Sequence, residues 1–179
     1  MTTDSDAEFT ALVLRQARFV FQVAYAVLLN AHEAEDAVQE TFLKLYRNRG
    51  WQQAQNERAF LARTAWRVAL DMRPSGPRSR AMIESLDHAD AIPAAQPGPD
   101  QMLLASDQHA RIHAALNTLP EELRVPLLLS SFDELNSREI GSVLGIPEGT
   151  VRTRLQRARS LLREKLTRLQ GHALEVHHG

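Results

Sequence analysis

Seven basic side chains and one acidic side chain lie between Thr150 and Arg168 of this 179-residue chain. Guanidinium groups bind phosphate oxygens and the edge of guanine, and a glutamine amide pairs with adenine, so these residue types suit contact with a nucleic acid. A run of charge is also the ordinary surface of a solvated helix. Charge alone leaves both interpretations open, and the spacing of the residues has to decide between them.

The spacing predicts a helix-turn-helix in this part of the chain. Asn136 is followed three residues later by Glu139, the pattern of a capping box at the start of a helix over Ser137–Leu144. Gly145 then permits a tight turn, and Pro147 suits the first turn of a second helix. Two short helices joined by a glycine turn are the pattern typical of this motif.

The second helix of this motif has one apolar side and one polar side. At 100° per residue the apolar stripe consists of Val151, Leu155, Ala158 and Leu162. The side chains that point away from it and can reach a major groove are Arg152, Thr153, Gln156 and Arg157, whereas Arg154 and Arg159 flank the stripe and suit phosphates. The alternative is a basic-faced helix of an ordinary bundle.

A helix predicted over residues 33–48 carries a second candidate surface. Its inward stripe consists of Ala34, Val38, Thr41, Phe42 and Leu45, and its outer face carries Asp36, Glu40, Leu43 and Arg47 with Gln39 at the edge. A leucine ringed by polar groups is how a small protein interface is built, although a single exposed leucine is also common on any surface. This face is therefore a candidate for binding another protein.

A third helix, predicted over Glu57–Met72, interleaves basic and apolar groups on one face. Leu61, Thr64, Ala65, Val68 and Met72 are predicted to point inward, which leaves Arg63, Trp66, Arg67 and Leu70 on the other side. Arginines contact phosphates and an aromatic ring stacks on any base, so this face suits a melted single strand. Alternatively, Trp66 packs beneath the N-terminal helix.

The elements that position these surfaces are helices on both sides of a linker. Five of the eight prolines fall between Arg73 and Asp100, and no period-two alternation or hairpin signal appears elsewhere. We therefore predict an all-α chain: a helical bundle over residues 1–73, a flexible Pro-rich linker over 74–107, and a second bundle with the helix-turn-helix over 108–179. The first helix is expected from Glu8 to Leu29, and Pro126 should kink or restart its helix.

Composition narrows the class of protein. A chain that is 44% hydrophobic and 24% charged, with a net charge of −1, is globular. No uninterrupted apolar run approaches the roughly 18 residues of a membrane span, so we expect no membrane insertion and a cytoplasmic protein.

The chain has no cysteine, and His32 with Glu33 lacks the further ligands of a zinc site. We expect no metal, no cofactor and no catalytic site, and hence no enzyme.

The helix-turn-helix leads to a family resemblance. Residues 119–166 resemble the fourth conserved region of extracytoplasmic-function (ECF) sigma factors of the sigma-70 family, through Leu119-Pro120, Arg124, Glu139-Ile140, Leu144-Gly145-Ile146-Pro147, Gly149-Thr150-Val151-Arg152 and Arg157-Ala158-Arg159. The resemblance implies that Arg152, Thr153, Gln156 and Arg157 lie next to the bases of the promoter's −35 element. LuxR-type regulators have a similar helix-turn-helix, so this half does not settle the class.

The front half resembles the second conserved region of the same family. Residues 34–47 are similar to its docking surface for the β′ clamp helices of RNA polymerase, which implies that Asp36, Gln39, Glu40 and Leu43 face the core enzyme. Residues 57–72 resemble its −10 recognition segment, with Arg67 where the family usually has asparagine.

The resemblance as a whole implies an alternative sigma factor. Such a factor binds core RNA polymerase at the β′ clamp helices and the β flap, contacts promoter DNA, and is often held by an anti-sigma factor. Two rival interpretations stay open: a stand-alone helix-turn-helix transcriptional regulator that dimerises through its front half, and a purely protein-binding helical module.

Overall fold

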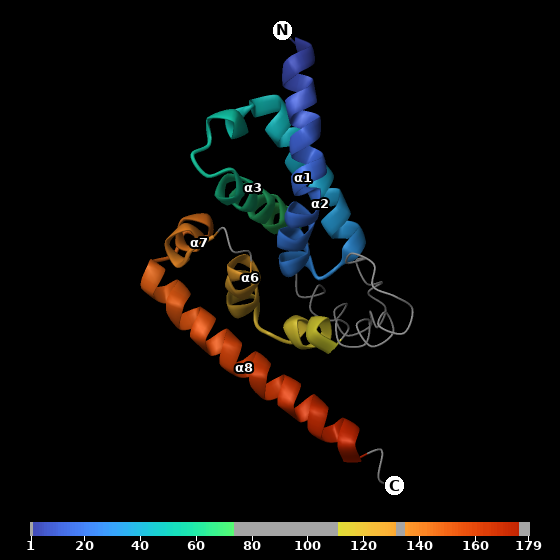
Figure 1. Ribbon diagram of the computed structural model, residues 1–179, viewed down its shortest axis with the longest axis vertical. Helices are drawn as coiled ribbons and strands as arrows, with labels where there is room; N and C mark the ends of the chain where they lie inside the picture. Colours follow the sequence, from blue (N-terminus) through green and yellow to red (C-terminus); the bar gives the residue numbers. More distant parts are fainter. Residues whose placement is uncertain (1, 74–110, 132–134, 176–179) are drawn as a thin grey trace.

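The computed structural model describes residues 2–73, 111–131 and 135–175, and every regular element in those ranges is a helix (Figure 1). The elements are α1 (Thr2–Leu28), α2 (Ala31–Asn48), the short 3-10 helix η1 (Gly50–Gln53), α3 (Glu57–Met72), α6 (Glu121–Ser130), α7 (Ser137–Leu144) and α8 (Glu148–Glu175). Residues 111–117 are also helical. The all-α prediction is confirmed, and the predicted linker over 74–107 lies outside the described residues.

Asparagine side chains fix where the helices of the front half begin. The Oδ1 atom of Asn56 accepts a hydrogen bond from the amide of Ala59 at 3.0 Å, and α3 has the bounds that the sequence predicted. Asn30 caps α2 in the same way through the amide of Glu33, so α2 begins at residue 31 rather than 33. The first helix begins at residue 2, six residues before its predicted start.

Helix α6 continues through Pro126, so of the two predicted outcomes, a kink or a restart, the restart does not occur. Proline removes one helical N–H, and the carbonyl that loses its partner belongs to Glu122, four residues earlier. Glu122 is an exposed residue of the first turn, where water can donate to that carbonyl in place of the missing amide. Because the first turn of α6 is exposed to water at Glu122, Pro126 lowers the stability of the helix less than it would in a buried turn.

A single hydrophobic cluster runs through both halves of the chain. Helices α1, α2 and α3 contribute residues such as Val20, Phe42 and Leu61, and the C-terminal half contributes Leu129, Ile140 and other buried side chains to the same cluster. Helix α6 packs against α1 and α7 packs against α3, while α8 crosses α6 and α7 (Figure 1). Nothing in the sequence periodicity predicted these contacts between the halves.

Helix α1 contains one stretch, Ser5–Leu28, that is long and apolar enough by length and composition to cross a membrane. This stretch is not an uninterrupted apolar run, because Arg15 and Arg18 lie within it, so it does not contradict the sequence prediction. The core helix of a soluble protein passes the same test, and three apolar residues of α1, Leu12, Val20 and Ala24, are fully buried within the fold.

The buried guanidinium of Arg124 joins the two halves. Its Nε atom donates to the carbonyl oxygen of Ala26 at 2.6 Å and its Nη1 atom donates to the carbonyl of Leu119 at 2.7 Å. Ala26 lies in the last turn of α1, where carbonyls have no further amide of the helix to accept from. Burial lowers the pKa of Arg124, an effect that the nearby Glu121 carboxylate partly opposes.

The helix-turn-helix is stabilised by the predicted capping box and by close backbone packing. Asn136 accepts from the amide of Glu139 at 3.0 Å, and the Glu139 carboxylate accepts from the amide of Asn136 at 2.8 Å. Gly145 has a φ of 68°, as the predicted turn requires. Sequence analysis missed Gly141, where a Cβ atom would lie 2.7 Å from the carbonyl oxygen of Ile146.

Replacement of Arg124 by methionine should destabilise both halves of the chain. The change leaves two buried carbonyls without donors, so we expect the free energy of unfolding to fall by about 2 to 4 kcal/mol. Both tryptophans, Trp51 and Trp66, lie in the front half, so a urea titration followed by tryptophan fluorescence reports the response of the half that is not mutated. The control is Arg111→Met at an exposed position. An unchanged tryptophan midpoint would show that the halves are not coupled.

Replacement of Gly141 by alanine should destabilise the helix-turn-helix. Alanine favours a helix by about 1 kcal/mol over glycine, but overpacking against a backbone oxygen costs about 1 to 3 kcal/mol, so a net loss is expected. Thermal unfolding followed by circular dichroism measures it. Gly149→Ala is the matched control, because no atom lies within 4 Å of its added Cβ. Equal melting temperatures for the two variants would contradict the packing argument.

Candidate nucleic-acid interface

Helix α8 presents its polar side to solvent as the periodicity predicted. Val151, Leu155 and Ala158 of the apolar stripe are buried, and Leu162 is half-buried. The four side chains predicted to point away from the stripe, Arg152, Thr153, Gln156 and Arg157, are all exposed. Their accessibility is what direct contact with a DNA groove requires.

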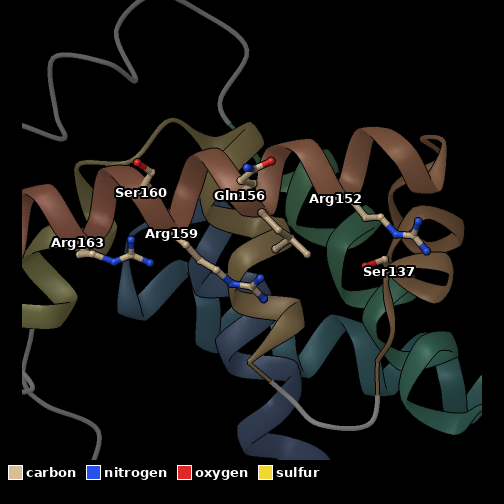
Figure 2. Close-up of a pocket in the computed structure, with 7 residues that line it drawn as sticks. Ser137, Arg152, Gln156, Arg159, Ser160 and Arg163 are labelled. Atoms are coloured by element: carbon tan, nitrogen blue, oxygen red, sulfur yellow. The ribbon is translucent and has the colours of Figure 1, made fainter.

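An open groove of about 510 Å³ runs along α8 and is bordered by cationic and hydroxyl side chains. Its lining residues are Ser137, Arg152, Leu155, Gln156, Arg159, Ser160 and Arg163. Figure 2 shows Arg159 and Arg163 one turn apart on α8, with Arg152 further along the helix near Ser137 at the start of α7. Three guanidinium groups and two hydroxyls that share one groove have the hydrogen-bond donors that successive phosphate groups would need.

The sequence predicted only some of the residues that line this groove. Arg152, Gln156 and Arg159 belong to the predicted set, whereas Ser160 and Arg163 do not. Both missed residues continue the same helical row by one turn, so the periodicity that selected the others could have found them. Ser137 belongs to the preceding helix α7, and only the packing of α7 against α8 brings it to the groove.

The other predicted residues of α8 differ in what they contact. Arg154 lies 3.9 Å from the carboxylate of Glu122 on α6, so it is directed toward that helix rather than into the groove. The Thr153 hydroxyl donates to the carbonyl of Gly149 at 3.0 Å. Arg157 is exposed but does not line the groove.

Arg152 forms an ion pair with Glu148 one turn earlier in α8. The Arg152 side chain is 70% exposed, and solvent-exposed pairs of this kind are weak. A phosphate or base edge can therefore displace the carboxylate.

Within the part of the chain that the structure describes, no group of three or more His, Asp or Glu side chains could hold a metal ion.

The outer face of α2 carries the residues predicted to bind another protein. Asp36, Gln39 and Leu43 are exposed and Glu40 is partly exposed. Leu43 is 48% accessible and Tyr46, one turn further along, is 44% accessible, so the apolar part of this face is larger than predicted. Of the predicted inward stripe, Val38 is only half-buried, and its neighbour Ala37 is fully buried instead.

The four residues predicted on the outer face of α3 do not form one open surface. Arg67 is exposed, but Arg63 donates to the carbonyl and hydroxyl oxygens of Ser142 on α7. Trp66 and Leu70 are half-buried and pack against the hydrophobic cluster. In this arrangement the helix-turn-helix half contacts the face that the sequence assigns to single-stranded DNA at Arg63, while Arg67 stays accessible.

Two family models match the chain in the order that the sequence analysis expected. Residues 12–75 match the model described as "Sigma-70 region 2", and residues 109–162 match the model described as "Sigma-70, region 4". The two matches together cover well over half of the chain.

Curated relatives with sigma-factor names match over most of the chain. It is 37% identical over 158 residues to the ECF RNA polymerase sigma factor SigE of Mycolicibacterium smegmatis, a match that covers 88% of this chain and 61% of that protein. It is 32% identical over 154 residues to the ECF RNA polymerase sigma factor SigW of Bacillus subtilis, covering 82% of each. The chain thus spans less than two thirds of the length of the first relative.

Solved structures share the fold at low sequence identity. The sigma factor RpoE of Bartonella quintana, solved in complex with the anti-sigma factor NepR, superposes with a TM-score of 0.65 at 22% identity, covering 89% of this chain and 97% of that chain. CnrH in complex with the cytosolic domain of CnrY superposes with a TM-score of 0.62 at 21% identity, covering 90% and 89% of the two chains. With region 2, region 4 and a relative matched over most of its length, the chain belongs to the ECF sigma factors of the sigma-70 family.

Proposed function

We propose that this chain binds core RNA polymerase and directs it to promoters through their −10 and −35 elements. Sigma factors bind core RNA polymerase and promoter DNA, and regions 2 and 4 are the parts that do so. The observation that carries the proposal for this chain is the groove along α8, where three arginines and a glutamine share one accessible row in the helix-turn-helix. Such a row suits a DNA major groove and its phosphates.

In this proposal α8 reads the −35 element. Arg152 and Gln156 have the chemistry for base edges, with Thr153 and Arg157 beside them on the exposed face. Arg159 and Arg163 lie further along the groove and bind phosphates, and the hydroxyls of Ser137 and Ser160 supply further donors. Arg154 acts from the flank of the helix, once its weak contact with Glu122 is released.

The outer face of α2 is the proposed polymerase surface. Leu43 supplies the apolar anchor, and Asp36, Gln39 and Glu40 form its polar surroundings. An accessible leucine beside acidic groups suits a partner that offers an apolar pocket bordered by basic side chains. The β′ clamp helices are the proposed partner, with the β flap as a second contact for the C-terminal half.

The outer face of α3 is the proposed −10 surface, formed by Arg63, Trp66, Arg67 and Leu70. With Arg67 where the family usually has asparagine, we propose that phosphate contact and aromatic stacking contribute more here than capture of a base by a side-chain amide. Residues 1–73 and 108–179 would then act as two DNA-binding units joined by 74–107. The protein acts in the cytoplasm and has no catalytic activity of its own, and an anti-sigma factor is a further proposed partner.

Run-off transcription tests the proposal directly. Purified chain is added to core RNA polymerase and a library of genomic fragments, and transcripts that start from a common promoter pattern are expected. A stand-alone regulator would neither co-purify with core polymerase nor start transcription. Failure to bind the core enzyme would therefore reject the proposal in favour of that rival.

Substitutions in the α8 groove should separate base reading from phosphate binding. Arg152→Ala should cost about 1 to 3 kcal/mol of discrimination at one −35 position if the guanidinium reads a base bidentately. Arg163→Ala should weaken binding to all sequences and reduce the slope of log affinity against log salt by about one. Anisotropy titrations of the polymerase complex on −35 variants over a salt series measure both effects. Arg18→Ala, at an exposed position of α1, is the control. If all three variants bind alike, α8 is not the reading helix.

Leu43→Ala should weaken polymerase binding without weakening the fold. Because the side chain is 48% exposed, stability should change by less than about 0.5 kcal/mol, whereas an anchor of an interface costs about 1 to 2 kcal/mol of binding. Leu14→Ala is the matched control, since this leucine of α1 is 81% exposed and lies outside the proposed surface. Affinity for core polymerase is measured with fluorescently labelled chain. Equal loss in both variants would remove α2 from the interface.

A further inference from the structure

Helix α8 contains two ion pairs of the same kind, and only one of them reaches the groove. Glu148 pairs with Arg152 and Glu164 pairs with Arg168, each across one turn of the helix. The two arginine side chains are similarly accessible, at 70% and 76%. Arg152 lines the groove, whereas Glu164 and Arg168 do not. Glu148 meets the groove through Arg152, so it places a carboxylate beside a guanidinium with the chemistry for a base edge.

This carboxylate does not suit a surface that only binds phosphates. From Gly149 to Arg163, α8 has five arginines and no acidic residue. A carboxylate next to them repels a phosphate group, so it lowers the affinity for any DNA sequence. A solvent-exposed ion pair across one turn also adds little to the stability of a helix. Base selection is the role in which a carboxylate beside Arg152 has a use.

The hydrogen bond between Glu148 and Arg152 leaves the guanidinium able to bind guanine. The Nη2 atom of Arg152 donates to the Oε1 atom of Glu148. Nη2 carries two N–H bonds, and the guanidinium has further N–H groups on Nη1 and Nε. One N–H of Nη2 can therefore stay with Glu148 while the other, together with a neighbouring nitrogen, donates to O6 and N7 of a guanine. A guanine that approaches in this way leaves the carboxylate in place.

The two side chains together match the hydrogen-bonding pattern of a G·C base pair. In the major groove this base pair offers the acceptors N7 and O6 of guanine and, beside them, the amino donor of cytosine. Arg152 supplies two donors, and the carboxylate held at its Nη2 atom supplies an acceptor next to them. Adenine offers the amino donor N6 where guanine offers O6, so an A·T base pair would direct a donor at the guanidinium.

We propose that Arg152 and Glu148 read one G·C base pair of the −35 element jointly, with Arg152 on guanine and Glu148 on the amino group of the paired cytosine. Glu148 is thus a specificity-determining residue, and it also positions the guanidinium of Arg152. This joint reading rests on the proposed function, because it requires that α8 enters the major groove of promoter DNA.

Selection from a randomised set of promoter duplexes tests the joint reading. Core polymerase carrying the chain is mixed with duplexes whose −35 region is randomised, and the bound duplexes are sequenced. The natural chain should enrich a G·C base pair at one position, and Arg152→Ala should lose that enrichment. Glu148→Ala should reduce it at least about fivefold, because the acceptor for cytosine is removed.

The matched control for this selection is Glu164→Ala. It breaks the same kind of ion pair on the same helix and removes the same charge, but it lies outside the groove. The G·C enrichment should therefore stay at the level of the natural chain. Equal sequence profiles for Glu148→Ala and Glu164→Ala would overturn the joint reading.

Glu148→Asp separates base reading from stabilisation of the helix. Aspartate keeps a negative charge in the first turn of α8, where it favours the helix dipole, but its shorter side chain withdraws the carboxylate from Arg152. We expect thermal unfolding like that of the natural chain and a loss of G·C enrichment close to that of Glu148→Ala. Enrichment at the natural level in this variant would overturn the joint reading, because a first-turn charge alone would then explain Glu148.

The same selection distinguishes failure of the joint reading from failure of the proposed function. If Arg152→Ala loses a preferred base pair that Glu148→Ala keeps, or if that base pair is not G·C, α8 reads the promoter and only the joint reading fails. If core polymerase does not retain the natural chain, or the complex enriches no −35 sequence, the proposed function fails and the joint reading fails with it.

Discussion

The guanidinium of Arg124 occupies the place where the two halves of the chain meet. It donates to the last turn of α1 and to the segment that precedes α6, so it satisfies carbonyl groups on both sides of the boundary with one buried cation. A buried charge is costly to desolvate, and the two short hydrogen bonds compensate for that cost only while both halves stay in place. Together with the packing of α6 on α1 and of α7 on α3, this contact sets the position of the C-terminal half relative to the front half.

The arrangement gives the three candidate surfaces different accessibility. The row of arginines on α8 is exposed, since only the opposite side of that helix is needed for packing. The outer face of α2 is also exposed, because α2 buries its other side against α1 and α3. The outer face of α3 is partly covered: Arg63 contacts Ser142 of α7, whereas Arg67 is exposed. The fold therefore exposes two of the three candidate surfaces and covers part of the third.

The sequence predicted the bounds and the buried side of a helix well where neighbouring residues of the same segment determine them. The bounds of α3 and α7 follow from Asn56 and Asn136, whose side chains cap the helix that comes directly after them. The buried stripe of α8 follows from helical periodicity, which needs no knowledge of the rest of the fold. At Pro126 the local sequence rules left a kink or a restart open, and the helix does not restart, because the free-energy cost of a missing amide depends on the exposure of the turn before it. They failed at Gly141, where the constraint comes from the backbone of Ile146 across the turn.

The sequence by itself determined the helical class, the helix-turn-helix and the polar face of α8, because caps, turns and periodicity act over a few neighbouring residues. The tertiary structure alone decided that Asn56 meets Glu139, that Arg63 meets Ser142 and that Ser137 joins the α8 groove. Asn56 and Glu139 are 83 residues apart in the chain, as Arg124 and Ala26 are 98 apart. Contacts of that range depend on which faces of folded helices pack together, and side-chain patterns within one helix carry no information about the partner that covers them.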